Sequence, residues 1–183
     1  VGEAIMIDAP YIFEDSGINK IGDTYYYSYC SNFNSRANAV GEHVPPAGEI
    51  IYMTSDTPIG PWEYQGSILK NPGYFFGTGG NNHHSMIQFH DQWLMFYHTQ
   101  ILQDSLKITG GYRSTSVNVV TVNEDGTINP IQANKKGVTQ LFSLNPYEEI
   151  LASTMSNSSG ISIIEEKKTS FKEVNKVSIS EID

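Results

Sequence analysis

The chain has 183 residues, 39% of them hydrophobic and 11% aromatic, a balance that allows one domain with a sizeable core and excludes general disorder. Its formal net charge of −9 disfavours nucleic acid and anionic membranes as partners and suits an uncharged ligand such as a sugar. The one cysteine, Cys30, excludes a disulfide framework and a cysteine-rich zinc site, and no run of residues is long and apolar enough to span a membrane.

Short β-type runs separated by turn residues dominate the N-terminal part of the chain. The Gly22-Asp23 pair is typical of a tight hairpin, and helical periodicity is hard to find. Strands are predicted over residues 10–13, 24–30, 49–55 and 62–69. Together they predict an antiparallel unit of about four strands.

The same pattern then begins again, with strands predicted over residues 84–89, 92–99, 112–122 and 127–132. A shift of roughly 68 positions places Asp23 on Asp91 and Tyr25 on Trp93, which is a weak internal repeat. Repeated units of about four strands are typical of propeller blades, and the alternative is two unrelated meanders of a β-sandwich. The sequence therefore predicts an all-β fold that forms part of a propeller, with about two to three blades in this chain.

A propeller closes only with about 4–8 blades, so we expect further blades N-terminal to this stretch or on a partner chain. Without them, the blade faces should expose apolar side chains that normally pack on a neighbouring blade. These side chains are Tyr27, Ile51, Met53, Leu94 and Phe96.

The composition shifts towards Ser, Asn, Lys and Glu near residue 145. We therefore divide the chain into propeller blades, residues 1–144, and the start of a separate module or a charged linker, residues 145–183. Residues 138–144 are predicted as a last strand of the closing blade. The chain does not begin with Met, so the lack of a signal peptide says little about export.

Four motifs occur in consistent order along residues 1–144. They are residues 13–20 followed by Tyr25-Tyr26, residues 55–62, residues 80–86, and residues 112–114 with 123–128. In this order they resemble glycoside hydrolase family 43, above all its arabinoxylan-debranching and β-xylosidase branches. The resemblance implies a five-bladed propeller. It also implies inverting hydrolysis of α-L-arabinofuranosyl or β-D-xylosyl linkages in arabinoxylan or related plant cell-wall polysaccharide.

Glycoside hydrolysis needs a protonated carboxyl group for the leaving oxygen and an ionised one to activate water. The family motif has Phe-Glu, then Ala-Ser or Gly-Pro, then a lysine; here Phe13-Glu14 is followed by Asp15-Ser16, with Lys20 at the family's spacing. The resemblance makes Glu14 the general acid, at the end of an inner strand, with a pKa that must be raised. On residue type alone, an exposed strand-end Glu is the commoner interpretation. Asp15 should face the other way on an extended strand.

The other half of the catalytic pair is expected outside this stretch. In the family, the catalytic base is an Asp near the start of the first blade, and a second Asp that tunes the acid also lies on an earlier blade. Asp8 precedes Glu14, but its sequence context belongs to the same blade, so we do not assign it the base. The resemblance therefore implies a glycosidase that is inactive without the missing N-terminal blades.

Two substrate-binding residues are predicted on loops and strand ends. The resemblance places Arg113 in the pocket near the acid, where it can bind sugar hydroxyls, whereas a lone strand Arg is commonly a surface residue. Phe33 follows a strand end, in a loop position suited to stacking on a sugar ring. We prefer it to the other aromatic candidates, which are Phe75, Phe76 and Trp93.

The adjacent pair His83-His84 should face opposite sides of a strand, which makes it a poor zinc pair. The resemblance assigns His83 to a largely hydrated calcium ion on the propeller axis, and we predict that His84 lines the substrate-binding pocket. Calcium prefers oxygen ligands, so such a site is unusual, and the alternative is a hydrogen-bonded core histidine.

The C-terminal stretch carries a weaker resemblance. Residues 145–149 with Thr154-Met155 resemble the opening of a family 6 carbohydrate-binding module, although residues 151–153 depart from it. A complete β-sandwich of this kind needs about 100 residues. We expect a secreted or cell-surface bacterial enzyme that acts on a plant polysaccharide or oligosaccharide. The alternatives are a non-catalytic carbohydrate-binding propeller and a structural β-sandwich without a site.

Overall fold

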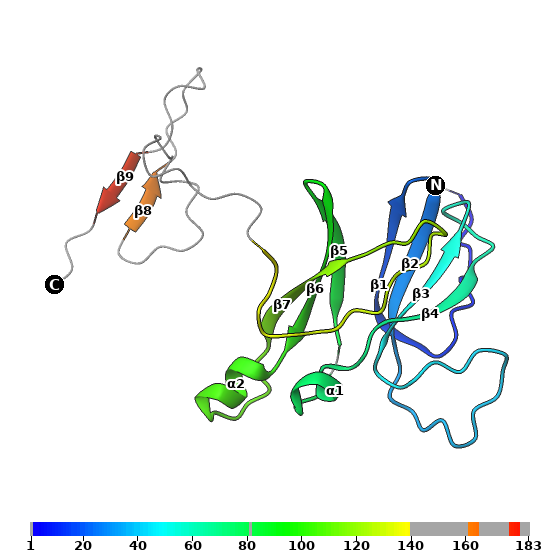
Figure 1. Ribbon diagram of the computed structural model, residues 1–183, viewed down its shortest axis with the longest axis horizontal. Coiled ribbons are helices and arrows are strands. Elements are labelled where there is room, and N and C mark those ends of the chain that lie inside the picture. The colour runs from blue at the N-terminus through cyan, green and yellow to red at the C-terminus, as the bar shows by residue number, and fades with distance from the viewer. Residues whose placement is uncertain (1, 81, 140–160, 165–175, 180–183) are drawn as a thin grey trace. The chain divides into compact units, whose positions relative to one another are not determined.

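A computed structural model describes residues 2–80, 82–139, 161–164 and 176–179 (Figure 1). The chain divides into two compact units, Val1–Val138 and Thr139–Asp183. Within the described residues, the first unit holds two antiparallel sheets and two short helices. No helix in the described part of the chain is long and apolar enough to cross a membrane.

The first sheet is a four-stranded meander. Its strands are β1 (Ile12–Ile21), β2 (Thr24–Ser31), β3 (Ile50–Ser55) and β4 (Glu63–Leu69), in the order β1-β2-β3-β4. The predicted hairpin is confirmed, since Ile21 pairs with Thr24 across a turn in which Gly22 has φ 60°. Most of β2 is buried, and successive residues enter two different apolar clusters, so both faces of this sheet are covered.

Strand β1 is irregular where the acid candidate lies. The prediction of a strand over residues 10–13 that ends at Glu14 is wrong, because Pro10 and Tyr11 form a turn and β1 starts at Ile12. Its pairing with β2 shifts on both sides of Glu14, which marks two bulges. Asp15 has φ 56°, in the left-handed region, so the chain is not extended there. Glu14 therefore lies in a bulged segment near the start of β1, and the strand continues beyond it to Ile21.

The second sheet has three strands in the order β5-β6-β7: β5 (His84–Phe89), β6 (Gln92–Thr99) and β7 (Ser114–Val120). The predicted fourth strand over residues 127–132 is wrong, since this segment makes only an isolated bridge, between Val122 and Ile128. The segment instead reaches back to the first sheet. The backbone N–H of Ile128 donates to the Tyr52 hydroxyl at 3.0 Å, and that of Ile131 donates to the Ile68 carbonyl at 2.7 Å.

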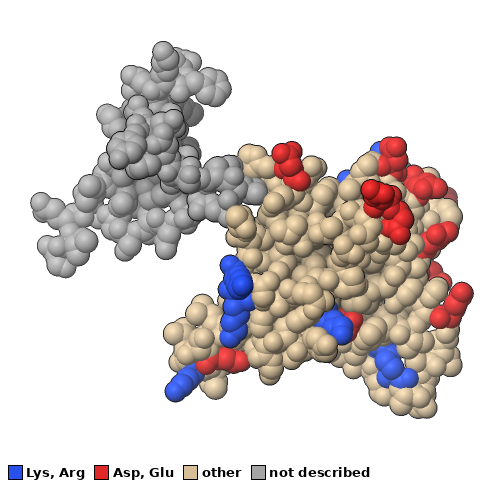
Figure 2. All heavy atoms as spheres, viewed as in Figure 1, with Lys and Arg blue, Asp and Glu red and all other residues tan. Residues whose placement is uncertain are grey.

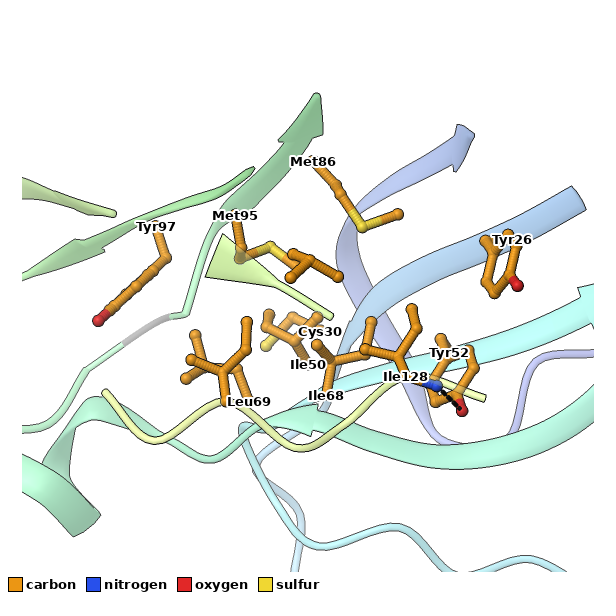
Figure 3. Close-up of a cluster of buried hydrophobic side chains, with 12 residues drawn as sticks. Tyr26, Cys30, Ile50, Tyr52, Ile68, Leu69, Met86, Met95, Tyr97 and Ile128 are labelled. Atoms are coloured by element: carbon orange, nitrogen blue, oxygen red, sulfur yellow. Dashed lines mark hydrogen bonds between the residues drawn. The ribbon is translucent and has the colours of Figure 1, made fainter. Parts of the chain in front are cut away.

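The main core lies between the two sheets (Figure 3). Side chains from both sheets and from the returning segment meet there, among them Tyr52, Leu69, Met95, Tyr97 and Ile128. Burial of this apolar surface, at about 25 cal/mol per Å², holds the two sheets together as one unit.

A second cluster covers the other face of the first sheet. It holds Tyr29 together with Tyr27, Ile51 and Met53, which are 7%, 0% and 3% exposed. The prediction that these side chains are exposed is therefore wrong, and it is also wrong for Leu94, at 5%. The cause is the N-terminal segment, because Ile7 and Ala9 pack on this face and Pro10 accepts a hydrogen bond from Tyr29 at 2.9 Å. Phe96 is half-buried.

Two short helices, which the sequence analysis did not predict, follow strands β4 and β6. Helix α1 (Pro72–Phe76) begins where the Asn71 side chain accepts a hydrogen bond from the Gly73 N–H, and it ends at Gly77 with φ 74°. Helix α2 (Ile101–Leu106) ends at Lys107, also in the left-handed region. Both helices occupy connections at the same end of the sheets (Figure 1).

In the second unit the described residues form one antiparallel pair, β8 (Ile161–Ile164) with β9 (Lys176–Ile179). The strand predicted over residues 138–144 falls mostly outside the described residues, and Val138 and Thr139 are not in a strand. The motif residues 145–155 also lie outside the described part, so the separate module stays a prediction.

Candidate active site

The predicted site residues gather at one end of the two sheets. At this end β1 and β5 begin, β2 and β6 end, and the loops that join β2 to β3, β4 to β5 and β6 to β7 emerge (Figure 1). Glu14, Phe33, His83, His84 and Arg113 all lie within these strand ends and loops. The opposite end carries the tight turns of the β1–β2 and β5–β6 hairpins.

Glu14 contacts His83 across the boundary between the two sheets. Its Oε1 lies 2.5 Å from His83 Nε2, and the two side chains are 32% and 38% exposed. On its other side the His83 ring packs edge-on against His98 at 5.4 Å, and the His98 N–H donates to the His83 carbonyl at 3.2 Å. The acid candidate is thus a partly exposed carboxyl held by an imidazole.

Asp15 contacts the next histidine, on the buried side. Its Oδ2 accepts a hydrogen bond from the backbone N–H of His84 at 2.7 Å and also bonds His84 Nδ1. His84 Nε2 bonds Ser28 Oγ at 2.7 Å, and the His84 side chain is only 2% exposed. His84 was predicted to bind substrate, but the structure buries it between Asp15 and Ser28, away from solvent.

Phe33 is an exposed aromatic residue in the loop that joins β2 to β3. It is 47% exposed and packs edge-on against Phe13 at 5.9 Å. Its ring lies against Gly48, where a Cβ would come within 2.3 Å of the Phe33 ring. The contact requires glycine, and it fixes the ring while leaving part of it open to a ligand.

The loop that carries Phe33 is held by Arg36, a residue that the sequence analysis missed. The Arg36 guanidinium donates to the backbone carbonyls of Asn32 and Pro45, both at 2.8 Å, and lies 4.4 Å from the centre of the Tyr11 ring. The sequence held a signal for this role, because the five N–H donors of an Arg in a loop without regular structure can bond the free backbone carbonyls of that loop.

Arg113 is exposed and directly precedes β7, so it stands at the same end as Glu14. No hydrogen bond or ion pair of its side chain falls within the part of the chain that the structure describes. The predicted approach of Arg113 to the acid stays a prediction.

The described residues do not supply a complete metal site. Among them no group of three or more His, Cys, Asp or Glu side chains is placed to hold an ion. His83 already uses Nε2 in its contact with Glu14, which leaves Nδ1 as its free ring nitrogen. Calcium takes about 6–8 oxygen ligands, so these residues alone do not fit a calcium ion.

Cys30 lies opposite Glu14 in the sheet but has no catalytic character. Burial raises the pKa of its thiol to about 12, and the nearby Asp15 carboxylate adds to the rise. The thiol therefore stays protonated at neutral pH, and since the thiolate is the reactive form, Cys30 is a packing residue.

Charge is distributed unevenly over the unit. Figure 2 shows acidic side chains gathered along the side of the first sheet, whereas the basic ones are scattered, most of them over the lower half of the view. The excess of acidic over basic residues, 20 against 11, leaves no extended basic surface in this view.

The sheets and the site define part of a five-bladed β-propeller of the kind found in glycoside hydrolase family 43. No family model matches the chain. Its relatives and structural neighbours are nevertheless family 43 arabinoxylan arabinofuranohydrolases and xylosidases, of which it covers a part.

Three comparisons define this likeness. The chain is 47% identical over 164 residues to an arabinoxylan arabinofuranohydrolase of Paenibacillus polymyxa, which covers 88% of this chain and 25% of the relative. A Bacillus subtilis family 43 arabinoxylan arabinofuranohydrolase, solved with cellotetraose, matches with a TM-score of 0.72 and 51% identity over 81% of this chain and 30% of its own. A third match is a β-xylosidase/α-arabinofuranosidase from a compost metagenome, solved in a calcium-free form with xylotriose. Its TM-score is 0.50, and the 33% identity covers 66% of this chain and 30% of the matched one. The chain thus spans about a quarter to a third of the length of these three proteins.

Proposed function

We propose that this chain is part of a family 43 glycoside hydrolase that releases α-L-arabinofuranosyl or β-D-xylosyl units from arabinoxylan or a related plant cell-wall polysaccharide, with inversion. The relatives named as arabinoxylan arabinofuranohydrolases support the substrate class. The observation that carries the proposal is the Glu14 carboxyl, which lies partly exposed at the bulged start of β1 and contacts His83.

In this proposal Glu14 is the general acid. It gives a proton to the glycosidic oxygen as the bond from that oxygen to the anomeric carbon breaks, and water attacks the opposite face of the sugar. Glu14 Oε1 lies 2.5 Å from His83 Nε2, so the imidazole holds the carboxyl in a fixed position. The base that activates the water is an Asp supplied by the remaining blades.

Two further residues would hold the sugar. The exposed face of Phe33, fixed against Gly48, suits stacking on a pyranose or furanose ring. Arg113 at the start of β7 can donate to sugar hydroxyls from the same end of the sheets. His84 would act indirectly, since its side chain is buried.

Calcium on His83 remains a proposal from the family resemblance, and a relative crystallised in a calcium-free form is compatible with it. The other ligands would be waters or groups beyond the described residues, because the described ones form no cluster.

The remaining proposals concern the whole protein. Its partners would be the polysaccharide and the N-terminal blades, on the same protein or on a partner chain. Residues 145–183 would begin a carbohydrate-binding module or a linker, and the enzyme would be secreted or held at a bacterial cell surface.

Product analysis tests the proposed function. The complete protein, meaning this chain together with the remaining blades, is incubated with wheat arabinoxylan and the products are followed by ¹H NMR. We expect free arabinose or xylose, with the first-formed anomer inverted relative to the substrate. Binding of arabinoxylan without release of sugar would instead support a non-catalytic carbohydrate-binding propeller.

A further inference from the structure

Two adjacent contacts join β1 to the first residues of the second sheet. Glu14 meets His83 on the partly exposed side, and Asp15 meets His84 on the buried side. Resting on the proposed function, we propose that Asp15, His84 and Ser28 form a buried clamp that positions His83 against the Glu14 carboxyl. These three are positioning residues, since none of them reaches the substrate.

The backbone at Asp15 makes the clamp possible. Its φ of 56° lies in the left-handed region, which Gly, Asn and Asp tolerate better than other residues. The pairing shift between Glu14 and Gly17 places an extra residue on β1 at this point. Bulges of this kind re-aim side chains. Here consecutive side chains of β1 reach consecutive residues of the neighbouring segment.

Asp15 Oδ2 holds both the backbone and the ring of His84. It accepts from the His84 N–H at 2.7 Å and bonds Nδ1 of the ring. Hydrogen bonds to an ionised carboxylate are stronger than those between neutral groups, and burial at 11% exposure strengthens them further. Because the bond fixes the backbone N–H of His84, it fixes the peptide that follows His83, and so the direction from which the His83 ring meets Glu14.

Ser28 completes the clamp from the middle of β2. Its Oγ lies 2.7 Å from His84 Nε2, so both ring nitrogens of His84 are bonded and the ring cannot rotate freely. The order Asp15, His84, Ser28 matches the order of groups in a serine hydrolase triad. Ser28 is only 1% exposed, however, so no substrate reaches it and the arrangement serves to orient the imidazole.

Two variants at Asp15 separate its hydrogen bonds from its backbone conformation. D15N and D15G both tolerate positive φ, but only the amide oxygen of D15N still accepts from His84. In the complete protein, we expect D15G to lower kcat on arabinoxylan about 10–100-fold with little change in KM, because misplacement of about 1 Å costs that much. We expect D15N to stay within about threefold of the parent.

The leaving group distinguishes positioning of the acid from general damage. An aryl glycoside with a good leaving group needs little protonation, so the D15G loss should shrink to about threefold on it. S28A should lower kcat on arabinoxylan about 3–10-fold, by loosening the His84 ring. Its matched control is S67A, because Ser67 Oγ is buried without a hydrogen-bond partner among the described residues.

Parental kcat of D15G on arabinoxylan, or an equal loss on both substrates, would overturn the clamp. A crystal structure of D15G provides a readout independent of activity: we expect the His83 ring to leave Glu14, and a retained contact at 2.5 Å would contradict the proposal. E14Q tests the proposed function separately. Full activity of E14Q would reject Glu14 as the acid, while the D15G structure would still decide whether the clamp positions His83.

Discussion

The two sheets differ in what covers them and in what they carry. The first sheet has four strands and apolar clusters on both faces, and its inner strand bears Glu14 and Asp15. The second sheet has three strands, and on one face it leaves Ile87, Phe89 and Val119 about half exposed. Its contribution to the site is the histidine pair at the start of β5.

The difference between the sheets arises where they meet, because the second four-strand unit uses its last predicted strand for a contact with the first sheet. The segment that would complete the second sheet is used instead to seal the two sheets together, through Ile128 and Ile131. The second sheet is left with three strands, and the segment contacts β3 and β4 of the first sheet instead, at Tyr52 and Ile68. We infer that the first sheet supplies the chemistry and that the second sheet holds it in place.

The largest effect should come from removing the proposed acid, Glu14, on the first sheet. E14Q in the complete protein should lower hydrolysis of arabinoxylan about 10²–10⁴-fold, the range for losing a general acid, and less for aryl glycosides with good leaving groups. The matched control is E63Q, which changes an exposed Glu of the same sheet on β4 and should leave kcat unchanged. Activity of E14Q within about twofold of the parent on arabinoxylan would reject this assignment.

The sealing segment should contribute more to stability than the outer face of the second sheet. I131A removes a side chain that is 6% exposed in the core and should cost about 2–5 kcal/mol. I87A makes the same change at a residue that is 51% exposed on β5 and should cost about 0.5 kcal/mol. Urea unfolding of the two variants measures the difference, and equal costs would refute the sealing role.

The hydrogen bond from the sealing segment to β3 can be tested by itself. Y52F removes the hydroxyl that accepts from the Ile128 N–H and leaves that buried N–H without its partner. We expect a loss of about 1–3 kcal/mol in the free energy of unfolding. In the double variant Y52F/I131A the losses should not add, because both residues fix the same segment. Strict additivity would indicate that the two contacts are independent.

The smallest effect concerns alkaline pH. Burial raises the pKa of Cys30 from 9.0 to about 12, so the unfolded chain loses this proton first and stability should fall as pH rises above about 9. Burial also raises the pKa of Tyr97, on the second sheet, from 10.0 to about 12, so Tyr97 affects the stability only at higher pH. Between about pH 8 and 9.5, C30A should flatten the fall in the urea midpoint. An unchanged slope would mean that Cys30 is not buried as described.

Much of the fold was predictable because its signals are local. Turn residues such as Gly22-Asp23 and the polar-apolar patterns between turns located β2 to β6 within a few residues. Helix α1 was missed although its signals are present, since Asn71, Pro72 and Gly77 are a typical N-cap, first-turn proline and C-cap glycine.

The errors arose where distant parts of the chain decide the structure. Residues 127–132 have a strand-like composition, but two of their backbone N–H groups donate hydrogen bonds to the first sheet, at the Tyr52 hydroxyl and the Ile68 carbonyl. The apolar faces were expected to be open because nothing in the sequence indicated that Ile7 and Ala9 would cover one of them.

The candidate site was predictable in part. The family motifs singled out Glu14 and His83, and the position of Phe33 in a loop after a strand singled out that residue. The structure adds the contact of Glu14 with His83 and that of Phe33 with Phe13. The bulge and the positive φ at Asp15 carry no periodic signal in a sequence, so the partnership of Asp15 with His84 and Ser28 emerged only from the structure.

A crystal structure of the complete protein carrying E14Q, with an arabinoxylan oligosaccharide bound, tests the central claim most directly. The variant should stop turnover while keeping the shape of the side chain. We predict that the side-chain amide at position 14 lies about 2.6–3.2 Å from the oxygen of the scissile glycosidic bond, with the sugar against Phe33. A scissile oxygen beside a different carboxyl group, with position 14 out of hydrogen-bonding reach, would contradict the account.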